Sequence, residues 1–97
     1  MTAYQVTVRD LDNAVLGEFP IDADGIVAAA RAVRNALHWR PYSALPRIST
    51  AELLPSPMAP GWRPSSRQVS LFDATGSEVG RAWVTRADGR PFAAVRR

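Results

Sequence analysis

The spacing of proline limits what this chain can fold into more than any other feature. Six of its eight prolines lie between residues 41 and 64, so this stretch can form neither a long helix nor a central strand. Regular structure must come mainly from the segments on either side. A long segment without regular structure is unusual in a compact domain. We therefore expect residues 41–66 to form a proline-rich loop that is partly packed down by aromatic and leucine side chains and partly a binding surface.

The first 21 residues predict a β-hairpin. Tyr4, Val6 and Val8 alternate with polar residues, which is the pattern of a strand with one buried face. Residues 10–13 have turn composition, and residues 14–21 follow as a second strand. Gly17 either weakens that strand or marks a bulge in it.

Residues 25–38 predict an amphipathic helix. Ile26, Ala30, Val33 and Leu37 recur at helical spacing and define an apolar face. The opposite face carries polar residues at the same spacing: Arg31, Arg34, Asn35 and His38. An aspartate just before the helix, Asp22 or Asp24, is expected to cap its first turn.

A single turn of helix is expected inside the proline-rich loop. Residues 49–52 read Ser-Thr-Ala-Glu, which resembles a capping box, and Pro55 would end such a turn. Leu53, Leu54 and the aromatic residues Trp39, Tyr42 and Trp62 are the side chains expected to fasten the loop.

The last third of the chain predicts three antiparallel strands at residues 67–73, 78–86 and 91–95. The turns between them fall at residues 74–77 and around Asp88-Gly89. Alternate residues of the middle strand face opposite sides of the sheet. Trp83, the largest of them, is expected to mark the buried side, with Arg81 at its margin.

Together these elements predict one α+β domain over residues 1–97, with the order ββαβββ. A single helix packs across one face of an antiparallel β-sheet, so that the apolar stripe of the helix and the apolar face of the sheet share one core. The proline-rich loop, residues 41–66, lies within this domain. A chain of 97 residues is of ordinary size for one domain.

Charge is unevenly distributed along the chain. The sequence has twelve arginines, no lysine and nine acidic residues, for a net charge of +3. Residues 1–24 carry one arginine and five acids, a net −4, whereas residues 25–97 carry eleven arginines and four acids, a net +7. Such polarity orients an approaching polyanion or acidic protein. The arginine excess itself is also what a GC-rich genome would produce, because arginine codons are GC-rich.

Several kinds of site are excluded or disfavoured by composition. With no cysteine there can be no disulfide and no thiolate site, and His38 is the single histidine, expected to end the helix rather than to catalyse. The Asp10-x-Asp12 and Asp22-x-Asp24 pairs lack the rest of a calcium loop and are interpreted as turn and cap residues. We expect no cofactor, no metal and no catalytic residue. Because no signal peptide or membrane span is evident, we expect a cytoplasmic protein without membrane contact.

These observations favour a non-catalytic binding module that docks on nucleic acid or on a nucleoprotein complex. The contacts are expected from the basic helix face, the proline-rich loop and the C-terminal hairpin. The candidate binding residues are Arg31, Arg34, His38, Trp39, Arg40, Trp62, Arg63, Arg81, Arg86 and Arg90.

Two other functions remain open. The first alternative is a protein–protein inhibitor of a host or defence complex, of the kind that phages and other mobile elements encode. Anti-CRISPR proteins, for example, are often single domains of this size. It would act through its acidic hairpin or its aromatic loop. The second is a small bacterial ribonuclease toxin, in which His38 would be catalytic.

Overall fold

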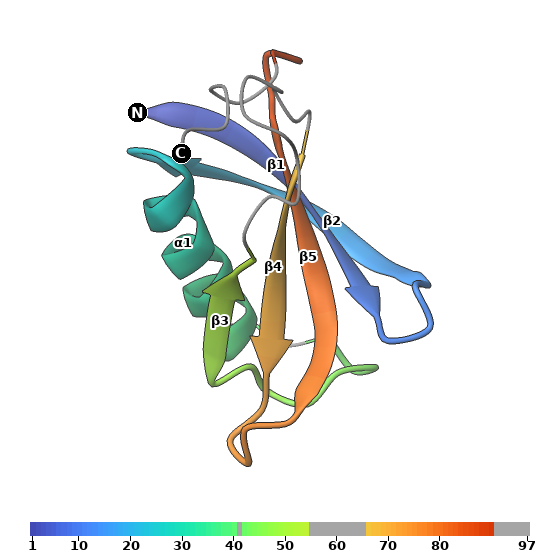
Figure 1. Ribbon diagram of the computed structural model, residues 1–97. Coiled ribbons are helices and arrows are strands. Elements are labelled where there is room, and N and C mark those ends of the chain that lie inside the picture. The colour runs from blue at the N-terminus through green and yellow to red at the C-terminus, as the bar shows by residue number, and fades with distance from the viewer. Residues whose placement is uncertain (41, 55–65, 91–97) are drawn as a thin grey trace.

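The protein is a five-stranded antiparallel sheet with one helix across it (Figure 1). The computed structural model describes residues 1–40, 42–54 and 66–90. The elements are β1 (Thr2–Asp10), β2 (Val15–Ala23), α1 (Ile26–Trp39), β3 (Thr50–Leu53), β4 (Arg67–Phe72) and β5 (Glu78–Arg86). The predicted α+β class and the ββαβββ order are confirmed. Within the described residues, no helix is both long enough and apolar enough to cross a bilayer.

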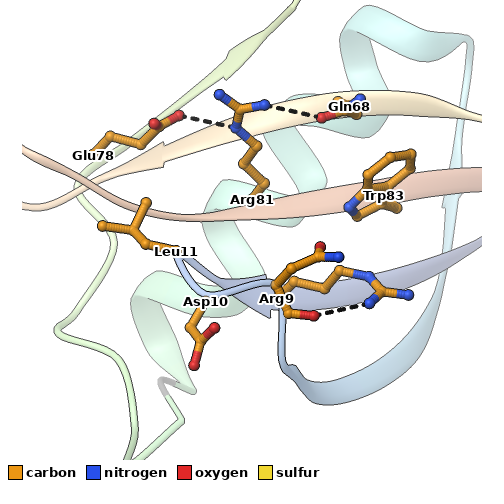
Figure 2. Close-up of a pocket in the computed structure, with 8 residues that line it drawn as sticks. Arg9, Asp10, Leu11, Gln68, Glu78, Arg81 and Trp83 are labelled. Carbon is orange, nitrogen blue, oxygen red and sulfur yellow. Dashed lines mark hydrogen bonds and ion pairs between the residues drawn. The ribbon is translucent and has the colours of Figure 1, made fainter.

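The strands lie in the order β2-β1-β5-β4-β3, and every neighbouring pair is antiparallel. The long N-terminal hairpin therefore supplies one half of the sheet, and β5 joins it to the C-terminal strands. The helix contacts β2 and β3, the two edge strands, so it crosses one whole face of the sheet. In the described part of the chain, the other face carries no helix, and we call it the open face (Figure 2).

The core lies between α1 and the sheet. Its fully buried side chains are mostly valines and leucines from alternate positions of the central strands, with Val33 and Leu37 from the helix. Leu45 and Ile48, from the segment after the helix, are also buried, and Tyr42 and Leu53 pack against this core. The expected packing of this segment is thus confirmed for Tyr42 and Leu53, whereas Trp39 is exposed and Trp62 lies outside the described residues.

The predicted aspartate cap of α1 was wrong. Gly25 is the N-cap residue, no side chain caps the helix, and its φ of 127° is one that residues with side chains rarely adopt. The chain passes directly from strand to helix through this glycine. Asp22 therefore remains in β2, and Asp24 lies 3.9 Å from the N-terminal amine instead.

The predicted helical turn at residues 49–52 was also wrong, because this segment is strand β3. Thr50 pairs with Phe72 and Leu53 with Val69, and the Ser49 amide donates to the Phe72 carbonyl at 2.8 Å. Pairing with β4 satisfies backbone groups that a single helical turn would leave open. The strand predicted at residues 91–95 lies outside the described residues.

Trp83 lies on the opposite face of β5 from the one expected. The buried residues of this strand are Gly80, Ala82 and Val84, whereas Trp83 is half-buried and Arg81 is exposed on the open face. At Gly80 the backbone of the neighbouring strand β1 leaves no room for a side chain. A Cβ atom on Gly80 would lie 2.6 Å from the Arg9 carbonyl oxygen.

Gly17 adjoins a bulge in β2, one of the two roles predicted for it. Val8 pairs with Gly17 and Arg9 with Val15, so Leu16 is the additional residue. A Cβ atom at Gly17 would lie 2.6 Å from Cζ and 2.7 Å from Cε1 of Tyr42. The absent side chain thus makes room for the Tyr42 ring, which joins the segment after α1 to β2.

This contact generates a stability prediction. Gly17→Ala should lower the free energy of unfolding by about 1–3 kcal/mol, because the added methyl group overlaps the Tyr42 ring. In a Tyr42→Ala background the same change should cost much less. Urea unfolding of the four proteins measures both effects, and equal costs in the two backgrounds would contradict the contact.

Candidate functional site

The described arginines lie mainly on two opposite surfaces of the protein. One is the exposed side of α1 with the segment that follows it. We call it the helix-side surface and define it by Arg31, Arg34, His38, Trp39, Arg40 and Arg47. The other is a depression in the open face, which we call the open-face hollow. It is lined by Arg9, Asp10, Leu11, Asn13, Gln68, Glu78, Arg81 and Trp83.

The helix-side surface comes from a segment without acidic residues. Residues 25–51 contain four arginines and one histidine but no aspartate or glutamate. Arg31, Arg40 and Arg47 are exposed, and within the described residues their guanidinium groups have no hydrogen-bond or ion-pair partner. Their positive charge is therefore uncompensated locally.

Arg34 and His38 have a different role, because both bind the segment that returns to β3. The Arg34 Nε donates to the Ser49 carbonyl at 2.9 Å, and the His38 Nδ1 lies 3.0 Å from the Ile48 carbonyl oxygen. A carbonyl oxygen can only accept, so the His38 Nδ1 carries the proton. His38 lies in the last helical turn as predicted, but its ring nitrogen bonds to this segment rather than to a helix carbonyl. These contacts fix the backbone next to Arg47.

Trp39 is the exposed aromatic residue of this surface. Its side chain is 73% exposed, and its ring meets the His38 ring edge to face, with centroids 5.1 Å apart. Because His38 is itself bound to Ile48, the Trp39 ring rests against an anchored neighbour. The helix ends here, with the Arg40 amide donating to the Ala36 carbonyl, because the next residue is a proline.

An apolar cavity of about 460 Å³ adjoins this surface between β2 and the end of α1. Its lining residues are Phe19, Pro20, Ile21, Ala36, Leu37, Arg40 and Tyr42. Arg40 is the charged residue of this lining. The cavity therefore combines an apolar interior with a positive charge.

The arginines of the C-terminal hairpin are mostly paired with acids. Arg81 Nε lies 3.3 Å from Glu78, and Arg86 Nη2 lies 2.8 Å from Asp88. The backbone amide of Arg90, and then the Arg86 guanidinium, lower the pKa of Asp88. Asp88 therefore stays ionised and keeps Arg86 engaged. Trp62 and Arg63, the other candidates, lie outside the described residues.

The open-face hollow is organised by a chain of hydrogen bonds across β4 and β5 (Figure 2). The Ser70 hydroxyl donates to Glu78 Oε2 at 2.6 Å, and Arg81 donates to Glu78 and to Gln68 Oε1 at 3.2 Å. The Ser70 hydroxyl, and then Arg81, lower the pKa of Glu78, although partial burial acts in the opposite direction. An ionised Glu78 thus holds Arg81 in place.

Nothing in the described residues resembles a metal site. Across residues 1–40, 42–54 and 66–90, no three histidine, aspartate or glutamate side chains form a group that could hold a metal ion. Asp10, one of the aspartates considered at the outset, accepts from the amides of Asp12 and Ala14, each at 2.9 Å. Its predicted turn role is confirmed.

The structure therefore brings together one part of the predicted site and separates another. Arg31, Arg34, His38, Trp39 and Arg40 share the helix-side surface, whereas Arg81 lies on the open face of the sheet. The sequence prediction missed Arg9 and Gln68 in the hollow. Alternation along each strand could have shown which side chains share a face with Arg9 in β1 or with Gln68 in β4. It could not show that β5 lies between β1 and β4 and so brings these two residues to one hollow.

The Ser70–Glu78 bond predicts a pH-dependent change in stability. Ser70→Ala should raise the pKa of Glu78 toward its ordinary value and cost about 1 kcal/mol of stability at neutral pH. A carboxyl group with a lowered folded pKa stabilises the fold above its unfolded pKa, and that contribution is lost as pH falls through the folded value. The difference between the variant and the natural protein should therefore shrink in acid.

Carboxyl NMR titration and urea unfolding at several pH values measure these two effects. Ser43→Ala, at an exposed serine, is the matched control and should change neither. An unchanged Glu78 titration in Ser70→Ala would show that the hydroxyl does not stabilise the carboxylate.

Comparisons of this chain with protein-family models, with curated proteins and with solved structures each found no match. A function for these surfaces is therefore argued from their own geometry and charge.

Proposed function

We propose that this protein is a non-catalytic binding module that docks on nucleic acid through its helix-side surface. The observation that carries this proposal is a group of three arginines, Arg31, Arg40 and Arg47, which have no partner in the part of the chain that the structure describes and share an acid-free segment with an exposed tryptophan. A nucleoprotein complex with exposed nucleic acid would bind to the same surface. A cytoplasmic location belongs to this proposal.

The chemistry of the surface suits phosphate. An unpaired guanidinium offers five donors in a planar fork that matches the oxygens of a phosphate group. Each phosphate that an arginine neutralises also releases condensed counterions, which favours binding at low salt. The acidic excess of residues 1–24 lies in the N-terminal hairpin. It repels a polyanion and so orients its approach toward the basic part of the protein.

The anchoring bonds of Arg34 and His38 support the same proposal. They fix the segment carrying Arg47 against α1, which carries Arg31, so these charges have a defined separation before any partner arrives. A surface arranged in advance loses less conformational entropy on binding. Arg34 and His38 are therefore positioning residues in this proposal.

The C-terminal hairpin contributes less in this proposal. Arg81 and Arg86 are each paired with a carboxylate, so they add no net charge that would attract a polyanion. Arg90 is exposed, and its backbone amide donates to Asp88 Oδ1 at 3.0 Å. We therefore place the main phosphate contacts on the helix-side surface, with Arg90 as the hairpin's available charge.

A second candidate, an inhibitor that binds a protein of a host or defence complex, is favoured by the apolar cavity that Arg40 lines. An apolar side chain of the partner would fill the cavity, and an acidic residue beside it would pair with Arg40. Tryptophan and arginine are the residues most enriched in the energetic centres of protein interfaces. This candidate requires an acidic protein surface.

The proposal predicts a change in salt dependence. In Arg31→Ala/Arg40→Ala, affinity for double-stranded DNA should fall, and the slope of log K against log salt should become shallower by about 1.8, since two phosphate contacts are lost. Fluorescence anisotropy over a series of salt concentrations measures the slope.

The matched control for this experiment is Ala14→Glu/Ala74→Glu. It makes the same change of −2 in net charge at two exposed turn positions away from α1. Its slope should stay close to that of the natural protein. Equal slopes in both double variants would show that net charge, rather than this surface, drives binding. If Arg31→Ala/Arg40→Ala loses binding to an acidic protein partner but keeps its affinity for DNA, the second candidate is favoured.

A further prediction concerns Trp39. Trp39→Ala should weaken binding to single-stranded DNA by about 1–3 kcal/mol through lost stacking on a base. Duplex binding, where bases are not exposed, should change much less. Because the ring is 73% exposed, stability in urea should be nearly unchanged. Equal losses for duplex and single strand would argue against stacking at this position.

A further inference from the structure

The core does not explain why a tryptophan stands in the middle of the open face. Trp83 belongs to the central strand, with Thr7 of β1 and Gln68 of β4 directly opposite it. Its ring is half-buried, on the side of the sheet away from α1. A large ring between two polar neighbours is suited to stacking against a planar group.

The hollow beside Trp83 provides room for such a group. It has a volume of about 290 Å³, and its lining is mostly polar. Figure 2 shows Arg81 reaching across to β4 on one side of Trp83 and Arg9 lying along β1 on the other. The hollow thus combines an aromatic ring, two guanidinium groups and side-chain amides.

Each arginine of the hollow is held in place but keeps donors to spare. Arg81 uses its Nε for Glu78 and its Nη1 for Gln68, and Arg9 uses its Nη1 for the Asn13 carbonyl at 3.0 Å. A guanidinium has five N–H donors, so both retain donors for an anion. Since Gln68 accepts through Oε1, its Nε2 group is left to donate to the edge of a base.

The hollow has no excess charge. Arg9 and Arg81 are balanced by Asp10 and Glu78, two positive charges against two negative ones. Both acids are already engaged, Asp10 by turn amides and Glu78 by Ser70 and Arg81. Stacking and directed hydrogen bonds, rather than counterion release, must therefore supply most of the affinity of any ligand.

We propose that the open-face hollow binds a nucleotide, with its base stacked on Trp83 and its phosphate held by Arg9 and Arg81. The nucleotide is either free or one unit of a single strand, because a base paired in a duplex cannot present its face. This site lies on the other side of the sheet from the helix-side surface. It rests on different residues and goes beyond the proposed function.

The test uses NMR titration of the isotope-labelled full chain with three probes: a deoxythymidine hexamer, uridine 5′-monophosphate and uridine. The amides of Gln68, Arg81 and Trp83 report on the hollow, and those of Arg31 and Arg40 report on the helix-side surface. In the natural protein the hexamer and the monophosphate should shift the hollow amides, and the monophosphate should bind more tightly than uridine. Higher salt should weaken binding at the hollow much less than at the helix-side surface.

Three variants make the test specific. Trp83→Leu should reduce affinity at the hollow about 5- to 150-fold through lost stacking. Arg81→Gln should reduce the preference for the monophosphate over uridine, because only Arg9 then holds the phosphate, and it keeps the test valid if Trp83→Leu fails to fold. Trp39→Leu, the same change on the opposite side of the protein, should leave the shifts of the hollow amides intact.

Two results would overturn the proposal: no shift of the hollow amides with either nucleotide probe, or, in the variants that fold, an unchanged affinity in Trp83→Leu and an unchanged preference for the monophosphate in Arg81→Gln. Shifts with the monophosphate but not the hexamer would identify a free nucleotide as the ligand. A protein partner that is lost in Trp83→Leu, without nucleotide shifts, would reassign the hollow to a protein interface. Arg31→Ala/Arg40→Ala should not affect the hollow, so failure of either proposal is recognised independently.

Discussion

The packing of α1 across one face of the sheet, from edge strand β2 to edge strand β3, determines the character of both faces. The helix contributes Ala29, Ala30 and Val33, which are almost completely buried, to the same core as Ala82 and Val84 of β5. Such small side chains allow dense packing between helix and sheet. Because successive strand residues point to opposite sides, the register that buries Ala82 also places Arg81 and Trp83 on the open face. The chemistry of the open face is thus a consequence of how the core packs.

Most of the fold could be predicted from the sequence because its main elements have strong periodic patterns. The hairpin, α1, β4 and β5 combine regular alternation or helical spacing with clear turn residues, and each was confirmed. The errors occurred where a local signal competed with a distant partner. Residues 50–53 have a local helix signal, but β4 offers them a strand edge. Trp83 was assigned to the buried side by its size, whereas the buried positions of β5 are Gly80, Ala82 and Val84, and Gly80 lies against the Arg9 carbonyl of β1.

The candidate site was less predictable, because the availability of an arginine depends on what lies near it in space. Helical spacing correctly placed Arg31 and Arg34 on one side of α1, but it could not show that Arg34 is bound to Ser49 while Arg31 stays unpartnered. The engagement of Arg86 by Asp88 is local and could have been suspected from the turn sequence. The hollow depends on β5 lying between β1 and β4, which no local pattern specifies.

The two surfaces differ in charge and lie on opposite sides of a sheet and a helix, and this arrangement restricts the nucleic acids that could use both. A helix with its side chains is about 10 Å across, and duplex DNA is stiff over about 150 base pairs. A duplex on the helix-side surface therefore cannot also reach the open face.

A single strand is flexible enough to pass around the sheet edge, and its unpaired bases can stack. The charge of the uncompensated arginines acts over a longer range than the neutral hollow. These arginines would therefore attract the nucleic acid to the protein, and Trp83 would then stack on one of its bases. A protein that uses both surfaces on one molecule should therefore select single strands over duplexes, because only a single strand satisfies the second surface.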